Sequence, residues 1–125
     1  MNVIDMNAEV GREMMGLRPE VPMRERVEAL QAEMLKYDQY EPPTVHRFHG
    51  GMYCREVAQV ADSLIVGKVH KKEHFFVLLS GTVAVTVGDF IESVKAPAVL
   101  QSYPGTKRAI YAVTPCSYMT VHRTD

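Results

Sequence analysis

The chain has 125 residues, 46% of them hydrophobic, which is enough for one core and too little sequence for two domains of ordinary size. Its 14 basic and 15 acidic side chains leave a formal charge of -1, which argues against nucleic-acid or membrane-surface binding driven by bulk charge. No segment reaches the roughly 18 apolar residues of a membrane span, and residues 1–16 lack the apolar stretch of a secretory signal, so we expect a soluble, cytoplasmic protein.

Residues 1–43 form an arm that is rich in Met, Glu and Arg. Pro22 suits the first turn of a helix, and the apolar residues that recur at helical spacing after it are Met23, Val27, Leu30 and Met34. We expect a helix whose apolar stripe packs either on the rest of the chain or on a second subunit. Pro42 and Pro43 end the arm, because proline lacks an amide donor and disfavours helix before it.

Residues 44–125 contain short runs of β-branched and aromatic residues separated by Gly, Pro and Asp. The predicted strands are Thr44–Phe48, Met52–Val57, Leu64–Val69, Phe75–Leu79, Val83–Val87, Phe90–Val94, Ala98–Ser102, Arg108–Val113 and Tyr118–His122. No interval has room for the crossover helix of a parallel sheet, so the pattern predicts an all-β antiparallel barrel of the jelly-roll type.

Two further features belong to this part. The run Phe75–Leu79 is apolar at every position, which favours a strand buried on both faces. Cys54 and Cys116 lie in a domain that is large enough to be stable without a disulfide bond, so we expect both thiols to be reduced.

Residues 62–81 resemble the first sequence motif of the cupins. Lys68 stands at the position of the first histidine of that motif, His70 at the second histidine, His74 at the glutamate and Gly81 at the closing glycine. The resemblance implies a cupin barrel, a double-stranded β-helix, and a homodimer.

Residues 97–108 resemble the second cupin motif. Gly105 matches its turn glycine, and Arg108 takes the place of the third metal-binding histidine. The barrel segment as a whole is also similar to small cupin-like proteins of tailed bacteriophages. That similarity implies the cytoplasm of an infected bacterium as the setting and no particular reaction.

Alternation of side chains along a strand indicates which residues share a face. If Lys68–His74 is extended without a bulge, Lys68, His70 and His74 point to one side, which in a cupin is the interior. Parity and the resemblance together predict one pocket lined by Tyr53, Arg55, Lys68, His70, His74, Arg108 and His122. His46 and His49 are expected at the surface or at a sheet edge.

The predicted pocket holds three fixed cations, three imidazoles and no carboxylate. A conventional metal site needs neutral imidazole or carboxylate ligands, and Lys68 and Arg108 at ligand positions oppose a divalent ion. No cofactor is therefore expected, although His70, His74 and His122 could form an unconventional site for a divalent transition metal.

The same cations suit a small anion, phosphorylated or nucleotide-like, bound by the group Tyr53, Arg55, Lys68, Arg108 and His122. His70 and His74 are the candidate catalytic residues, because imidazoles serve as acid and base near pH 7. Two alternatives stay open: a metal-dependent cupin enzyme that uses the three histidines, and a structural virion or assembly protein. Whether the protein is an enzyme is left undecided.

Overall fold

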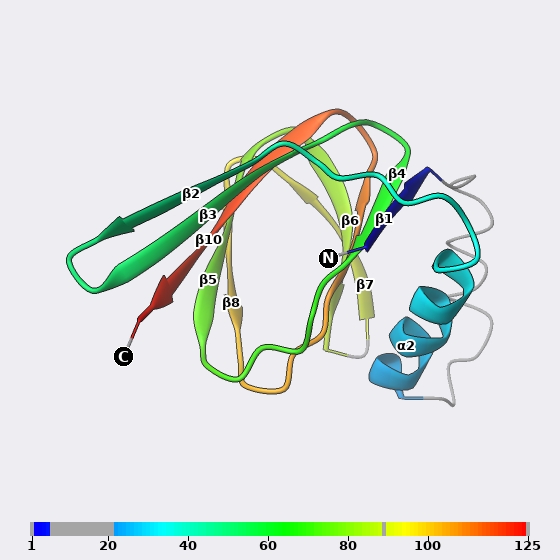
Figure 1. The fold of residues 1–125 in the computed structure, drawn as a ribbon, viewed down its shortest axis with the longest axis horizontal. Helices are drawn as coiled ribbons and strands as arrows, with labels where there is room; N and C mark the ends of the chain where they lie inside the picture. Colours follow the sequence, from blue (N-terminus) through cyan, green and yellow to red (C-terminus); the bar gives the residue numbers. More distant parts are fainter. Residues whose placement is uncertain (1, 6–21, 89, 125) are drawn as a thin grey trace.

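The computed structural model describes residues 2–5, 22–88 and 90–124. They form two antiparallel five-stranded sheets that face each other, with a helix against the outer side of one of them (Figure 1). This is the antiparallel jelly-roll architecture that the sequence predicts.

The first sheet, sheet A, has the strand order β1-β4-β9-β6-β7. Its strands are β1 (Asn2–Asp5), β4 (Ser63–Val66), β9 (Ala109–Ala112), β6 (Thr82–Val87) and β7 (Phe90–Lys95). The second sheet, sheet B, has the order β2-β3-β10-β5-β8. Its strands are β2 (Thr44–His49), β3 (Met52–Gln59), β10 (Cys116–Arg123), β5 (His74–Ser80) and β8 (Ala98–Ser102).

The helix α2 (Met23–Met34) starts directly after Pro22 and buries the apolar stripe that the spacing predicts. The stripe residues form a core cluster with Leu64, Val66, Ala109 and Tyr111 of sheet A. The helix therefore covers its own barrel, which decides between the two expected positions. Arg26 is buried as well, although the pattern places it on an exposed face of the helix.

The arm also contributes a strand that the sequence pattern does not predict. Asn2–Asp5 pairs antiparallel with β4, so an entirely helical arm was wrong for these residues. The part of the arm at residues 6–21 lies outside the described residues. The described parts of the arm are therefore joined to the barrel, β1 by its pairing with β4 and α2 by its packing on sheet A.

Predicted and observed strands differ mainly within and next to the two cupin-like motifs. The strand predicted over Leu64–Val69 ends at Val66, and residues 67–73 form a loop. The strand predicted over Arg108–Val113 covers Ala109–Ala112. The other predicted strands are confirmed, with ends that shift by at most two residues.

Both sheets contribute side chains to one apolar core between them. Its buried members are Val57, Ile65, Phe76, Leu78, Val83, Val85, Ile110, Ala112, Cys116 and Tyr118. The Tyr118 hydroxyl donates to Gln59 Oε1 at 3.0 Å, and Gln59 Nε2 donates to the backbone oxygen of Ser63 at 2.9 Å. Polar groups inside this core are thus hydrogen-bonded, as their burial requires.

The turn between β5 and β6 requires glycine. Gly81 has a φ of +86°, and a Cβ there would lie 2.7 Å from Cys116 Cβ and in contact with the carbonyl oxygen of Pro115. A side chain at this position would force the two sheets apart locally, which explains the match to the closing glycine of the motif.

The outward face of β5 differs from expectation. Phe75 and Leu79 are 49% and 41% exposed, so the strand alternates between buried and exposed positions. Burial on both faces was therefore wrong for the described chain, because α2 covers sheet A and leaves this face of sheet B open. Cys54 and Cys116 are both free, as expected.

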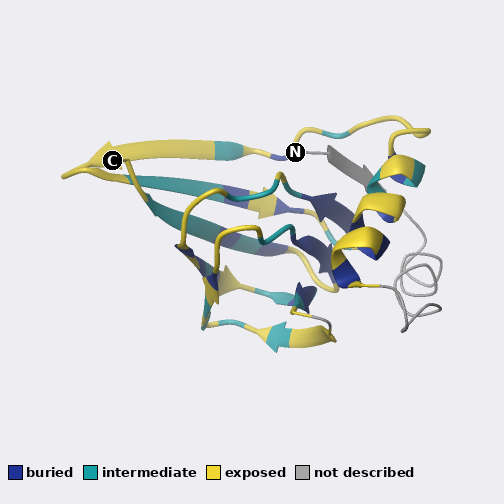
Figure 2. Ribbon diagram, turned by 90° about the horizontal axis from the view of Figure 1, so that it is seen from below, coloured by how far each residue is buried: buried dark blue, intermediate teal, exposed yellow. Residues whose placement is uncertain are grey.

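Burial in sheet B falls toward one end. Figure 2 shows β3 and β10 changing from buried in the middle of the molecule to partly exposed near the β2–β3 hairpin. The hairpin extends past the rest of the barrel in Figure 1. Among the described residues, no helix combines the length and apolar character needed to span a membrane.

Candidate functional site

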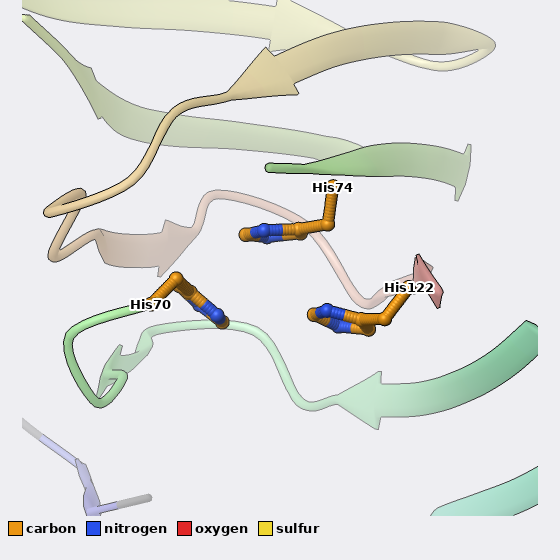
Figure 3. Close-up of side chains that lie close together, drawn as sticks. All are labelled: His70, His74 and His122. Carbon is orange, nitrogen blue, oxygen red and sulfur yellow. The ribbon is translucent and has the colours of Figure 1, made fainter. Parts of the chain in front are cut away.

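Three histidines converge at the less buried end of the barrel interior (Figure 3). His70 comes from the loop at residues 67–73, His74 is the first residue of β5, and His122 lies on β10. One ring nitrogen from each lies within 4.8 Å of those from the other two. The ring centroids of His70 and His74 are 4.0 Å apart, and those of His74 and His122 are 4.4 Å apart.

Backbone contacts bring His70 to this position. The loop lacks the extended strand that the parity argument assumes, so alternation does not orient His70. Instead, its amide donates to the Thr106 carbonyl at 3.0 Å, and the Gly105 amide donates to the His70 carbonyl at 2.8 Å. The two motif-bearing segments are therefore joined by backbone hydrogen bonds, which hold His70 next to His74.

The histidines are kept neutral by their surroundings. Burial, followed by the positive charge of His122, Arg108 and Arg55, lowers the pKa of His70 to about 4. Burial and the neighbouring His70 and His122 lower the pKa of His74 to about 4. Burial and Arg55 also lower the pKa of His122. At neutral pH each ring therefore keeps a nitrogen lone pair.

The donor set fits a transition metal. Within the described residues, the ring nitrogens of His70 and His122 make no hydrogen bond, and the only one at His74 is a long Nδ1 contact of 3.5 Å to the Lys72 carbonyl. Neutral imidazole suits zinc, copper, iron and nickel. Three protein ligands that leave a further position open are typical of catalytic rather than structural metal sites.

Arg108 lies beside the histidines but is held by its own acceptors. Its side chain is buried and donates to Ser102 Oγ at 2.6 Å and to the Thr86 carbonyl at 3.2 Å. The guanidinium carbon lies 5.7 Å from the centre of the Phe76 ring. Burial lowers the pKa of Arg108. The residue at the third histidine position of the motif thus belongs to the wall of the barrel, and His122 supplies the third imidazole.

A small cavity of about 30 Å³ lies between the histidines and the core. Arg55, Arg108 and Thr120 line it together with His70 and His74. Thr120 Oγ1 is buried and has no hydrogen-bond partner within the described chain. The cavity is large enough for about one water molecule and provides the polar contacts that such a molecule needs.

A larger pocket of about 440 Å³ opens on the outer side of His70 and His122. Tyr53, Arg55 and Lys68 line it. Lys68 is exposed, so it lies at the rim and not in the interior with His74, where the parity argument places it. Of the predicted residues, His74 and Arg108 line the small cavity and not this pocket, whereas Arg55 and His70 line both.

His46 and Lys71 also line the outer pocket and were missed. His46 Nδ1 and the Tyr53 hydroxyl oxygen are hydrogen-bonded at 2.6 Å, and the Tyr53 ring stacks on His122 with centroids 5.7 Å apart. The register of the β2–β3 hairpin could have predicted the position of His46. A two-residue turn at Gly50-Gly51 places His46 opposite Arg55, on the same face as the pocket residues of β3.

No protein-family model matches the sequence, and no curated protein matches it closely enough to count as a relative. Solved structures do match. A cupin superfamily protein of Desulfitobacterium hafniense aligns with a TM-score of 0.58 and 10% identity over 75% of this chain and 87% of that one. A cupin 2 domain-containing protein of Halorhodospira halophila gives 0.59 and 14% over 71% and 70%.

An acetylacetone dioxygenase of Acinetobacter johnsonii aligns with a TM-score of 0.54 and 11% identity, over 64% of this chain and 58% of that one. At such low identity these matches establish the fold alone. The predicted fold class, a double-stranded β-helix, is thereby confirmed.

Proposed function

We propose that this cupin-fold chain binds a divalent transition metal through His70, His74 and His122 and acts on a small anionic ligand beside it. The observation that carries the proposal is the convergence of three ring nitrogens within 4.8 Å of one another. A metal centre requires ligand nitrogens that converge and are free of competing hydrogen bonds. Here a loop and two strands bring three imidazoles together, and these have few such bonds.

The positive charges of Lys68 and Arg108, which stand at ligand positions of the motif, do not prevent metal binding by the histidines. Lys68 is exposed at the rim of the outer pocket, and the guanidinium of Arg108 is bonded to Ser102 and Thr86. Neither side chain therefore needs to occupy a ligand position. The charge of Arg108 helps to keep the imidazoles unprotonated, since it contributes to the lowered pKa of both His70 and His74.

An anionic ligand is supported by the residues of the 440 Å³ pocket. Arg55, Lys68 and Lys71 give it three cations, and no carboxylate is among the described residues that line it. A bound metal would polarise a ligand oxygen or activate water. The basic side chains would draw in and orient the anion. Tyr53, hydrogen-bonded to the exposed His46, adds a hydroxyl to the lining of this pocket.

The metal-free version, with His70 and His74 as an acid and base pair, has less support. A pKa of about 4 leaves both rings without the proton that a general acid must carry at pH 7. The structural version in which the helix stripe contacts a partner is also less well supported, because that stripe is buried against sheet A. A bacteriophage origin, a cytoplasmic location and a homodimer remain expectations of the resemblance.

Metal analysis of protein purified without a polyhistidine tag tests the proposal. We expect about one equivalent of a transition metal, or uptake of one equivalent of Co²⁺ or Zn²⁺ by the metal-free protein. His70→Ala, His74→Ala and His122→Ala should each reduce the bound metal strongly. His49→Ala, at an exposed position near the hairpin tip, is the matched control and should bind metal normally. Metal far below one equivalent after reconstitution would exclude the site.

The ligand class is tested by thermal unfolding of the metal-loaded protein with phosphate, sulfate, carboxylates, nucleotides and sugar nucleotides. Binding to the folded state raises the midpoint by an amount that grows with the logarithm of the ligand concentration relative to its dissociation constant. We expect stabilisation by at least one anion, reduced by Lys68→Gln and unaffected by Lys95→Gln on β7. The absence of any shift with every anion would rule out the anionic ligand while leaving the metal result intact.

A further inference from the structure

A second pocket, of about 380 Å³, opens on the other side of the histidines. His74 and His122 line this pocket, whereas His70 and His122 line the 440 Å³ pocket. His122 is therefore a wall shared by two pockets. A ligand held at the three histidines has space on both sides, and the two sides differ in chemistry.

The charge of the two pockets differs. The 440 Å³ pocket, here called the cationic pocket, is lined by Arg55, Lys68 and Lys71, and none of the described residues that line it is acidic. The 380 Å³ pocket, here called the apolar pocket, contains one acid and one base, Glu73 and Arg123, whose charges cancel. An anionic group therefore gains electrostatic energy only on the cationic side.

The apolar pocket also gathers exposed hydrophobic side chains. Met52, Phe75 and Tyr103 line it and are 48%, 49% and 58% exposed, and Val121 adds an aliphatic wall. They come from β3, β5, the segment after β8, and β10, so residues distant in the sequence supply one apolar surface. Covering such side chains is favourable in proportion to the area removed from water.

We propose that the ligand is an amphiphilic organic anion whose acidic head lies in the cationic pocket and whose apolar tail lies in the apolar pocket, passing the metal at His122. The inference rests on the proposed function and deepens it by naming the ligand class. A head alone would leave the apolar pocket in water, and a neutral apolar molecule would gain nothing from the charge of Lys68 and Lys71. A molecule with both groups satisfies the two pockets at once.

The test is a calorimetric titration of zinc-loaded protein with straight-chain carboxylates from acetate to octanoate, in a buffer without phosphate. Each buried methylene should strengthen binding about threefold to fourfold until the pocket is filled. Alcohols of equal length should bind at least tenfold more weakly, because they lack the charge. Alkyl phosphates of equal length show whether the head is a carboxylate or a phosphate.

Variants assign each half of the ligand to its pocket. Phe75→Ser and Tyr103→Ser should flatten the dependence on tail length and leave the affinity for acetate unchanged. Lys68→Gln with Lys71→Gln should weaken all the carboxylates by a similar factor and leave that dependence intact. Phe90→Ser, at a 73% exposed position on β7, and Lys95→Gln are the matched controls and should change neither property.

Three results would overturn the proposal: affinity independent of tail length, equal binding of alcohols and carboxylates, or no saturable binding of any member of the series. Separate metal analysis keeps this failure distinct from failure of the metal site. If metal binds and the series shows no tail dependence, only the ligand class is wrong. If the series behaves as expected on protein that takes up no metal, only the metal centre is wrong.

Discussion

The two ends of the barrel interior are made by the same strands and have opposite character. At one end of sheet B, Val57 and Leu78 flank Tyr118 in register, and all three are buried. Four residues farther along β10, His122 is paired with Tyr53, and both are only partly buried. Over a length of about 13 Å of strand, the interior changes from hydrocarbon to imidazole and phenol.

This difference separates stability from function within one sheet. The apolar end excludes water and supplies the packing energy of the fold. The histidine end holds cations and imidazoles. The pKa values of the His70 and His74 imidazoles are lowered, which means that the folded state disfavours the protonated forms of these two rings. We therefore expect mutations at the two ends to have different consequences.

Truncation at the apolar end should have the largest effect. Leu78 is fully buried, and Leu78→Ala should lower the free energy of unfolding by about 2–5 kcal/mol, measured by urea denaturation. Leu79→Ala is the control on the same strand, at a 41% exposed position, and should cost less than about 1 kcal/mol. Metal content per folded molecule should be unchanged in both. Equal costs for the two variants would contradict the assigned burial.

Acid should act on the histidine end. His70 and His74 titrate near pH 6.5 in the unfolded chain and near 4 in the folded one. Between these values the unfolded state binds more protons, so the free energy of unfolding of metal-free protein should fall as pH drops from about 6.5 to 4. We expect a loss of about 2–4 kcal/mol for the pair, less than the shifts alone imply, because solvent still screens the half-buried His70.

Urea denaturation in the presence of a chelator, repeated across this pH range, measures that loss. The double variant His70→Gln with His74→Gln is the control and should show a flatter dependence on pH. A wild-type slope that matches the double variant would mean that the two imidazoles are solvated in the folded protein.

Two tyrosine hydroxyls give the smallest and most direct comparison. The Tyr118 hydroxyl donates to buried Gln59, so Tyr118→Phe leaves an acceptor without its donor and should cost about 1–3 kcal/mol. The Tyr53 hydroxyl is bonded to exposed His46, and Tyr53→Phe should cost about 0.5 kcal/mol, since water replaces the bond. Thermal unfolding of both variants checks the difference, which disappears if the two ends contribute equally to stability.

Most of the fold could be predicted from the sequence, because the patterns that indicate strands, turns and the helix are local. Period-two alternation and glycine turns locate the strands, and the spacing of Val27, Leu30 and Met34 identifies α2 and its buried face. The short strand at Asn2–Asp5 was missed, because four residues without a flanking turn carry little periodic signal and its pairing with β4 is a tertiary contact.

The site was less predictable, since it depends on a loop. Parity along Lys68–His74 assumes an extended chain, whereas residues 67–73 are irregular and Lys68 faces solvent. His70 reaches the site through hydrogen bonds to a turn some 35 residues away in sequence, which no local pattern encodes. His46 was predictable in principle, because a two-residue turn sets its register opposite Arg55.

The backbone hydrogen bonds between His70 and the turn at residues 103–106 have a dynamic consequence. His122 lies on β10, which pairs with β3 through His122 and with β5 as far as Val121. The His70 loop is bonded at Gly67 to Arg108 and is otherwise attached through the amides of His70 and Gly105. Local opening begins where fewest contacts must break, so the loop should detach before the strand does. Deuterium uptake at these two amides would then report how often the histidine cluster opens, independently of any ligand.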